Sequence, residues 1–260
     1  MCPPTQVHRL DLNTSGVLLF GKSAGAASRL MRSFETHQTH KRYAALCTAT
    51  GTLGTPGTPG IIDTPGTPGT IGTPGTIGTV GTVGTRPPEG GDLGTVPGSL
   101  LVDAPICRVA DVDHCERRCC APGEEGGQEA RTRLLLVARA GGGGGACAVL
   151  ATPQHGRTHQ VRLHCARAGA PILADTLYNT EPTQPCAAAA AELPTALLSR
   201  HALHAYTLRL PHPSTGEDLE IIAPLPSDML DAAHELDLQP SGEAADAAVA
   251  QLHKALARPK

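Results

Sequence analysis

Residues 51–98 form a low-complexity tract, and this tract decides how the rest of the chain must be organised. It repeats Gly-Thr-Pro and Gly-Thr-Ile/Val units in threes and holds few large apolar side chains, so it cannot build a core. A three-residue glycine period is typical of collagen, but proline recurs irregularly here, and a triple helix needs two further chains. We therefore predict a disordered insertion, with a short β-solenoid edge as the minority alternative. Because closure entropy grows only logarithmically with loop length, the segments on either side can form one domain.

Outside the tract, the pattern of apolar residues predicts an α+β fold. The predicted strands are residues 17–20, 42–48, 133–139, 147–152, 202–210 and 218–222, the last two forming a hairpin across a Ser-Thr-Gly turn. The predicted helices are residues 24–37, residues 158–168 with Gly169 just beyond, and residues 227–236 with Ser227 as N-cap. Neighbouring strands outnumber helices, so we expect a mixed, mostly antiparallel sheet with flanking helices.

The chain then divides into four segments. Residues 1–50 and 99–236 are predicted to be the two parts of one folded domain, which residues 51–98 interrupt. Residues 237–260 are acidic and rich in alanine, and we expect them to form a solvated tail, either helix or coil.

Composition excludes several classes of protein. Aromatic residues make up only 2% of the chain, which excludes an RNA recognition motif because that platform needs several clustered aromatics. No apolar run approaches the roughly 18 residues of a membrane span, and no signal-peptide pattern opens the chain. The nine cysteines are odd in number and scattered, as is typical of reduced thiols. We therefore expect an intracellular protein, cytoplasmic or organellar, with no membrane partner.

The net charge of −3 hides a strong asymmetry along the chain. Residues 1–42 carry six cations against two acids, and residues 131–170 carry six arginines and no acid. Residues 214–260 carry nine acids against three cations. If the two basic segments meet in space, they form a face that suits a polyanion such as a nucleic acid.

Two sequence patterns suggest a nucleotide site and a metal site, but their residues do not support either. Residues 16–23 read GVLLFGKS and match the P-loop pattern, but their middle four residues are those of a strand, whereas a P-loop must curl around phosphate. P-loop nucleotide binding is therefore a remote alternative. The histidines at 155, 159 and 164 have no acidic residue near them to complete a metal site, and the His/Cys group within 114–120 lies among Gly, Pro and charged residues. We predict no metal site.

Three polar segments carry the chemistry. Residues 8–16 read HRLDLNTSG, a polar turn that places Asp11 where a loop meets a strand. An isolated Asp in such a turn would most often be a cap or Asx-turn residue, but two further segments change this interpretation. Residues 41–45 read KRYAA and place Tyr43 behind two cations. Residues 156–164 read GRTHQVRLH and open a helix with two arginines, groups suited to phosphate or to an ionised carboxylate.

In that order, these segments resemble the RluA-type pseudouridine synthases, which carry HRLDxxTSG, KxYxA and GRTHQIRxH. Weaker landmarks follow in residues 170–178, 204–205, 212–217 and 223–226. The resemblance covers residues 7–48 and 98–228. The family's first strands, and any S4-like RNA-binding domain, are not seen ahead of residue 8, so we expect a truncated gene model.

The resemblance implies that the protein isomerises uridine to pseudouridine in structured rRNA or tRNA, with base flipping and without any cofactor. It implies three catalytic residues, namely Asp11 at the ribose, Tyr43 on the uracil, and Arg157 pairing with the Asp11 carboxylate. Arg9 is expected to fill the space that the flipped nucleotide leaves. The other substrate-binding residues are expected to be Thr14, Lys41, Arg42, Thr158, His159, Gln160 and Arg162, with Lys41, Arg42 and Arg162 on phosphates. We expect a monomer, and the alternative is an inactive RNA-binding remnant of the same family.

Overall fold

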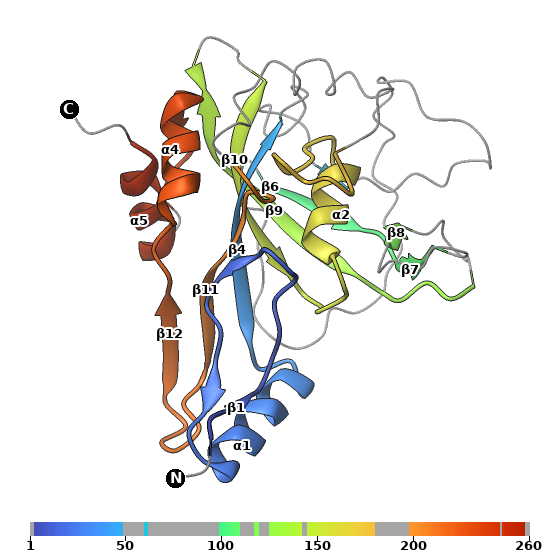
Figure 1. Cartoon of the computed structure of the whole chain (residues 1–260), viewed down its shortest axis with the longest axis vertical. Helices are drawn as coiled ribbons and strands as arrows, with labels where there is room; N and C mark the ends of the chain where they lie inside the picture. The colour runs from blue at the N-terminus through green and yellow to red at the C-terminus, as the bar shows by residue number, and fades with distance from the viewer. Residues whose placement is uncertain are drawn as a thin grey trace.

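The computed structural model describes residues 3–48, 60–61, 99–109, 117–119, 125–141, 145–179, 198–244 and 246–257. Within these residues, a nine-stranded sheet forms the centre of the molecule (Figure 1). Its main path runs β12 (Asp218–Ile222), β11 (Leu203–Pro211), β4 (His40–Thr48), β10 (Ala146–Pro153), β9 (Arg131–Ala140), β6 (Ser99–Asp103) and β5 (Gly60–Ile61). Two short strands join off this path, as β13 (Leu238–Pro240) pairs with β9 and β2 (Ser15–Gly16) pairs with β11. The predicted mixed, mostly antiparallel α+β fold is confirmed, since only the β5–β6 and β2–β11 pairs are parallel.

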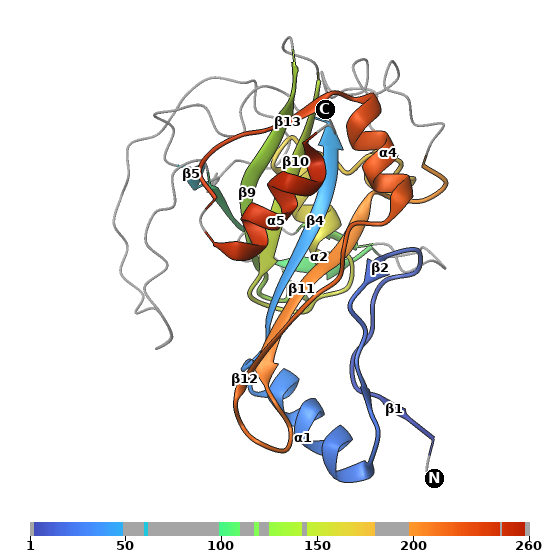
Figure 2. The same ribbon diagram turned by 90° about the vertical axis from the view of Figure 1, so that its left-hand side faces the viewer.

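The helices cover both faces of this sheet. In Figures 1 and 2, α2 (Gln160–Arg167) lies on one face, and α4 (Ser227–Glu235) and α5 (Ala247–Leu256) lie on the other. A buried core runs through the sheet from strand residues such as Leu46, Leu134 and Val149 to helix residues such as Met229 and Leu252. A separate short hairpin is formed by β7 (Ile106–Arg108) and β8 (Arg117–Cys119).

The N-terminal segment packs against the far ends of β11 and β12 (Figure 2). Strands β1 (Thr5–Gln6) and β3 (Phe20–Gly21) pair antiparallel, and α1 (Ala24–Glu35) closes this end of the molecule. The residues that resembled a P-loop have structural roles here. Ser23 is the N-cap of α1 and accepts from the backbone N–H of Ala26. A Cβ at Gly21 would lie 2.6 Å from backbone atoms of Ala27, so only glycine lets the helix approach this closely.

Three local predictions need correction. Residues 17–19 are not a strand, because the chain there bridges from β2, paired with β11, to β3, paired with β1. Ser227 is the first residue of α4 rather than its N-cap, which is Pro226 and makes no side-chain cap bond. The acidic tail is not a solvated segment, because α5 buries one face, including Val249 and Leu252, against the core.

Other predictions hold where the chain is described. The predicted hairpin is the antiparallel pair β11–β12, and Gly169 follows α2 in the left-handed region with φ 71°. The prediction for residues 51–98 lies outside the described residues, except that Gly60–Ile61 pairs with β6. No helix in the described part of the chain is long and apolar enough to cross a membrane.

Candidate active site

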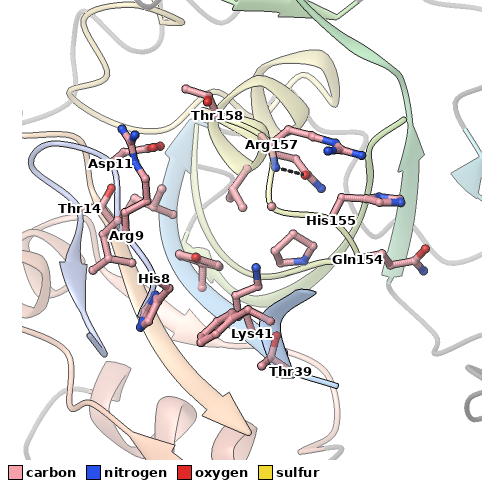
Figure 3. A pocket seen from close by; sticks show the side chains of 18 of the residues that line it. His8, Arg9, Asp11, Thr14, Thr39, Lys41, Gln154, His155, Arg157 and Thr158 are labelled. Carbon is pink, nitrogen blue, oxygen red and sulfur yellow. Dashed lines mark hydrogen bonds between the residues drawn. The ribbon is translucent and has the colours of Figure 1, made fainter. Parts of the chain in front are cut away.

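The three motif segments meet at one cavity of about 310 Å³ (Figure 3). The loop before β2, the end of α1, the start of β4 and the turn that leads into α2 form its walls. Of the predicted site residues, the cavity is lined by Arg9, Asp11, Thr14, Lys41, Tyr43, Arg157, Thr158 and Gln160. Sequence segments more than 100 residues apart therefore converge, and Asp11 is the one carboxylate among the described residues of the lining.

Strand β11 and the residues just before it hold the loop that carries Asp11 in place. Thr14 Oγ1 hydrogen bonds to His201 Nε2 at 2.8 Å, and Ser15 Oγ to His204 Nδ1 at 2.9 Å. Gly16 is required as β2 joins β11, because its φ is 119° and a Cβ there would lie 2.3 Å from the Ala205 carbonyl oxygen. The two histidines thus position the loop, a role that sequence reasoning missed because their partners lie almost 190 residues away.

Alternation along β4 places its two basic residues on opposite faces of the sheet. Lys41 and Tyr43 share one face and line the cavity, whereas Arg42 points to the other face. There Arg42 hydrogen bonds to Thr207 and forms ion pairs with Glu220 and Asp246. Arg42 therefore ties β4 to β12 and to the start of α5, and the structure does not bring it to the predicted substrate site.

Hydrogen bonds from the buried Gln160 hold the turn that leads into α2. Gln160 is buried, its Oε1 accepts from the Arg157 backbone N–H at 3.1 Å, and its Nε2 donates to the Arg131 carbonyl at 2.9 Å. The Arg157 Nε donates to the carbonyl of Glu129 at 3.0 Å, and in Figure 3 this guanidinium points away from Asp11. The predicted pairing of Arg157 with the Asp11 carboxylate is therefore not seen.

Arg162, the second arginine of the GRTHQVRLH segment, is held by Asp175 rather than by Asp11. Arg162 is buried and binds Asp175 through two hydrogen bonds, of 2.7 and 2.6 Å. Burial lowers the pKa of Arg162, but the hydrogen bonds to Asp175 and the charges of Asp175 and Asp11 outweigh it and raise that pKa. Buried in this way, Arg162 lies outside the cavity lining and is not an exposed phosphate contact. His159 lies outside the lining as well, with its Nδ1 at 2.7 Å from the Tyr178 hydroxyl.

Burial favours the uncharged forms of three rings near Asp11, those of Tyr43, His8 and His201. Burial and the Asp11 carboxylate raise the pKa of Tyr43 to about 12. Burial and the charge of Lys41 lower the pKa of His8 to about 4, and burial and Arg162 lower that of His201 to about 4. At neutral pH the His8 and Tyr43 rings of the lining are therefore uncharged, and the lining also holds the basic residues Arg9, Lys41 and Arg157.

Comparison with known proteins shows the family of this chain. The model of the RNA pseudouridylate synthase family matches residues 2–167, which include all three motif segments. The chain belongs to the RNA pseudouridylate synthase family. The "Ribosomal large subunit pseudouridine synthase D" of Vibrio cholerae is 32% identical over 227 residues, which are 86% of this chain and 53% of the relative. That of Vibrio vulnificus is 30% identical over 233 residues, 88% of this chain and 55% of the relative. The chain thus spans about half the length of these curated relatives.

Solved structures agree on the fold of this RNA pseudouridylate synthase family member. The human RNA pseudouridylate synthase domain containing 1 has a TM-score of 0.59 at 21% identity, covering 98% of this chain and 80% of the human one. The human RNA pseudouridylate synthase domain containing 4 has a TM-score of 0.57 at 20% identity, covering 91% and 77%. The likeness places the cavity within a pseudouridylate synthase fold, and the residue-level arrangement described above is that of this chain.

Proposed function

We propose that this chain isomerises uridine to pseudouridine in structured RNA, either rRNA or tRNA, with Asp11 as the catalytic carboxylate. The observation that carries the proposal is the convergence of Asp11, Tyr43 and three cations on one cavity. Its volume of about 310 Å³ is at the lower end of ligand pockets, roughly 300–1,000 Å³, and suits one flipped nucleotide.

The reaction needs no added group, because it only exchanges one bond for another within the substrate. The bond between ribose C1′ and uracil N1 breaks, the uracil turns, and a bond forms between C1′ and C5. The proton leaves C5, and N1 ends protonated. We assign Asp11 to the ribose, since it is the carboxylate of the lining and its loop is fixed by His201 and His204.

Tyr43 is proposed to pack against the uracil and to guide the proton from C5. With its pKa raised to about 12, the phenol stays protonated at neutral pH, so it serves as a neutral hydroxyl rather than as a phenolate base. Its place beside Asp11 on the wall of the cavity supports this assignment.

RNA would be held by the cations of the cavity and its rim. Arg9 is exposed and is proposed to fill the gap left by the extruded nucleotide, while Arg157 and Thr158, in the turn that leads into α2, are proposed as polar contacts. Such contacts weaken as salt is raised, because bound RNA releases counterions.

An inactive RNA-binding remnant is the second candidate, and it rests on a specific observation. The chain spans 53% and 55% of the length of two curated relatives, those from Vibrio cholerae and Vibrio vulnificus. A remnant would keep the basic cavity and bind RNA without isomerising it.

One experiment separates the two candidates. The chain is incubated with transcripts of large-subunit rRNA and with tRNA, and pseudouridine is mapped by carbodiimide reactivity. We expect conversion at specific uridines, lost in Asp11→Asn and retained in Asp218→Asn, whose carboxylate is exposed and pairs with Arg209 outside the cavity. RNA binding without conversion would favour the remnant, and conversion that persists in Asp11→Asn would refute the assignment of Asp11.

A further inference from the structure

The Arg200 guanidinium joins the first turn of α4 to the loop before β2. Its Nε and one of its Nη atoms donate to the two carboxylate oxygens of Asp228, at 2.9 and 3.1 Å. Such a paired contact fixes the plane of the guanidinium. The other Nη donates to the backbone carbonyls of Asn13, His201 and Leu203, at 3.2, 3.4 and 3.2 Å. One side chain therefore holds together three segments that are far apart in the sequence.

The contact with Asn13 lies two residues from the proposed catalytic carboxylate. Asn13 is in the left-handed region with φ 69°, and the turn around it is closed by a hydrogen bond from the Thr14 backbone N–H to the Asp11 carbonyl, at 3.0 Å. In the described part of the chain, Arg200 is the one side chain that hydrogen bonds to the backbone of residues 9–13. The two histidines described above hold the loop only from residue 14 onward, so Arg200 supplies the anchor nearest to Asp11.

These contacts need the shape of a guanidinium and not only its positive charge. The Arg200 side chain is 16% exposed, and Asp228 also accepts from the Met229 backbone N–H at 2.9 Å. The N–H groups of a guanidinium form a rigid planar fork that can reach a carboxylate on one side and carbonyls on the other, whereas the three donors of a lysine radiate from one atom. The pair with Asp228 thus sets the orientation in which the remaining N–H groups of Arg200 meet the loop.

We infer that Arg200 is a positioning residue for the isomerisation, which fixes the Asp11 loop through the Asn13 carbonyl while Asp228 fixes Arg200. The inference rests on the proposed function of Asp11, and it gives the start of α4 a part in the reaction. Arg200 and Asp228 both lie outside the cavity lining. A displacement of about 1 Å at a reacting group can lower a rate about 100-fold, so a loosened loop should slow the reaction although every group of the lining is still present.

Hydrogen exchange followed by mass spectrometry tests the contact without RNA. The unaltered full chain is compared with Arg200→Gln, Arg200→Lys and Asp228→Asn. The matched control is Arg209→Gln, because Arg209 also pairs with an aspartate but is 55% exposed and lies outside the cavity lining.

Two peptides of the chain report local and general opening. A peptide over residues 11–17 reports the loop, because the backbone N–H groups of Thr14 and Val17 are hydrogen-bonded in the folded chain. A peptide over β10 reports the centre of the sheet, where the strand pairs on both sides with β4 and β9.

We expect the loop peptide to exchange about tenfold faster in Arg200→Gln, as the loss of one charge-assisted hydrogen bond allows. Arg200→Lys should behave like Arg200→Gln, because both lose the fork. Asp228→Asn should give a smaller increase, since it removes the partner that orients Arg200 and leaves the guanidinium in place. The control Arg209→Gln should leave the loop unchanged, and the β10 peptide should exchange at the same rate in every variant.

Single-turnover conversion of a uridine-containing transcript then tests the consequence for the reaction. In Arg200→Gln and Arg200→Lys the rate constant at saturating enzyme should fall about 10–100-fold, because Asp11 is no longer held in place. The enzyme concentration that gives half of this rate should change less than about threefold, because the groups proposed to bind RNA are unaltered. Arg209→Gln should keep both values.

Several outcomes would overturn the inference. Unchanged exchange of the loop in Arg200→Gln would do so, and so would an equal increase in the β10 peptide, which would show a general loss of stability. Recovery of exchange and rate in Arg200→Lys would show that the charge matters and the orientation does not. A faster-exchanging loop with an unchanged rate constant would separate Arg200 from the reaction. If the unaltered chain converts no uridine, the proposed activity fails, and the exchange rates by themselves decide whether Arg200 holds the loop.

Discussion

The buried ion pair between Arg162 and Asp175 offers the sharpest test of the architecture under the cavity. Both side chains are almost fully buried, with 5% and 1% of their surfaces exposed. Asp175 also accepts from the backbone N–H groups of Leu177 and Tyr178, at 3.0 and 3.2 Å. We predict that Asp175→Asn destabilises the fold strongly, because it leaves the Arg162 charge buried without its main partner.

The magnitude follows from the contacts. Removing one partner of a buried pair costs about 3–5 kcal/mol. Asn keeps a carbonyl oxygen for the two backbone donors, and the Asp11 charge still acts on Arg162, so the loss should lie near the lower end, about 3 kcal/mol. Arg162→Met combined with Asp175→Asn removes both charges, and this double variant should be more stable than Asp175→Asn alone.

Urea unfolding followed by circular dichroism measures these differences as shifts in midpoint at constant slope. The matched control is Asp218→Asn, which breaks the pair between Asp218 and Arg209, whose side chains are 66% and 55% exposed. It should leave the midpoint unchanged, since exposed pairs contribute little. The argument from burial is wrong if the double variant loses as much stability as the two single changes together. It is also wrong if Asp175→Asn shifts the midpoint no more than Asp218→Asn does.

Three further predictions follow from single residues. Burial lowers the pKa of His164 from 6.5 to about 4, so as the pH falls the unfolded chain binds a proton at this residue before the folded chain does. The contribution of His164 to the free energy of unfolding is therefore full above pH 6.5 and falls by roughly 3 kcal/mol as the pH drops to about 4. Urea unfolding measured across this pH window should show the loss of stability, and in His164→Gln the stability should fall less steeply with pH. Asp246 accepts from two backbone N–H groups at the start of α5, so Asp246→Ala should cost about 1–2 kcal/mol in thermal or urea unfolding. Because the pKa of Tyr43 is raised to about 12, the rate of isomerisation should be flat from about pH 8 to about pH 10, measured on a converted transcript.

Each of these has an outcome that would count against it. A pH profile of stability that is the same in His164→Gln would show that other groups produce the acid loss. Asp231→Ala, which alters an exposed acid within α4, serves as the control for Asp246→Ala, and equal losses would argue against a capping role. A rate that climbs tenfold per pH unit in the alkaline range would identify a phenolate at Tyr43 as the base.

Sequence reasoning was most reliable where the physics is local. The period of apolar residues located α1, β4, β9, β10, α2 and the β11–β12 hairpin, because periodicity reports which face of an element is buried. It was weaker where elements are defined by their partners. Residues 17–19 are apolar, yet they only connect two short strands that pair with different partners. The α5 segment was predicted as a solvated tail because it is acidic and rich in alanine, although its Val249, Leu252 and Leu256 are buried.

The basic residues of the site also show the difference between what local sequence predicts and what distant partners decide. Lys41 and Arg42 look equivalent in sequence, yet strand alternation sends one into the cavity and the other to two acids on β12 and before α5. Arg157 and Arg162 both belong to the GRTHQVRLH segment, yet the structure directs the first to the Glu129 carbonyl and buries the second against Asp175. Alternation along β4 was readable in advance, but the acids that neutralise Arg42 lie about 180 and 200 residues away.

The amino-acid sequence by itself determined the family, the fold class and the three segments that build the cavity, because ordered motifs and apolar periods are properties of the chain alone. Only the tertiary structure decided which basic residues line the cavity with Asp11, which one is tied to distant acids, and which one is buried against Asp175. The physical reason is that the charge state and availability of a side chain depend on its burial and on its neighbours in space, and those neighbours come from distant parts of the chain.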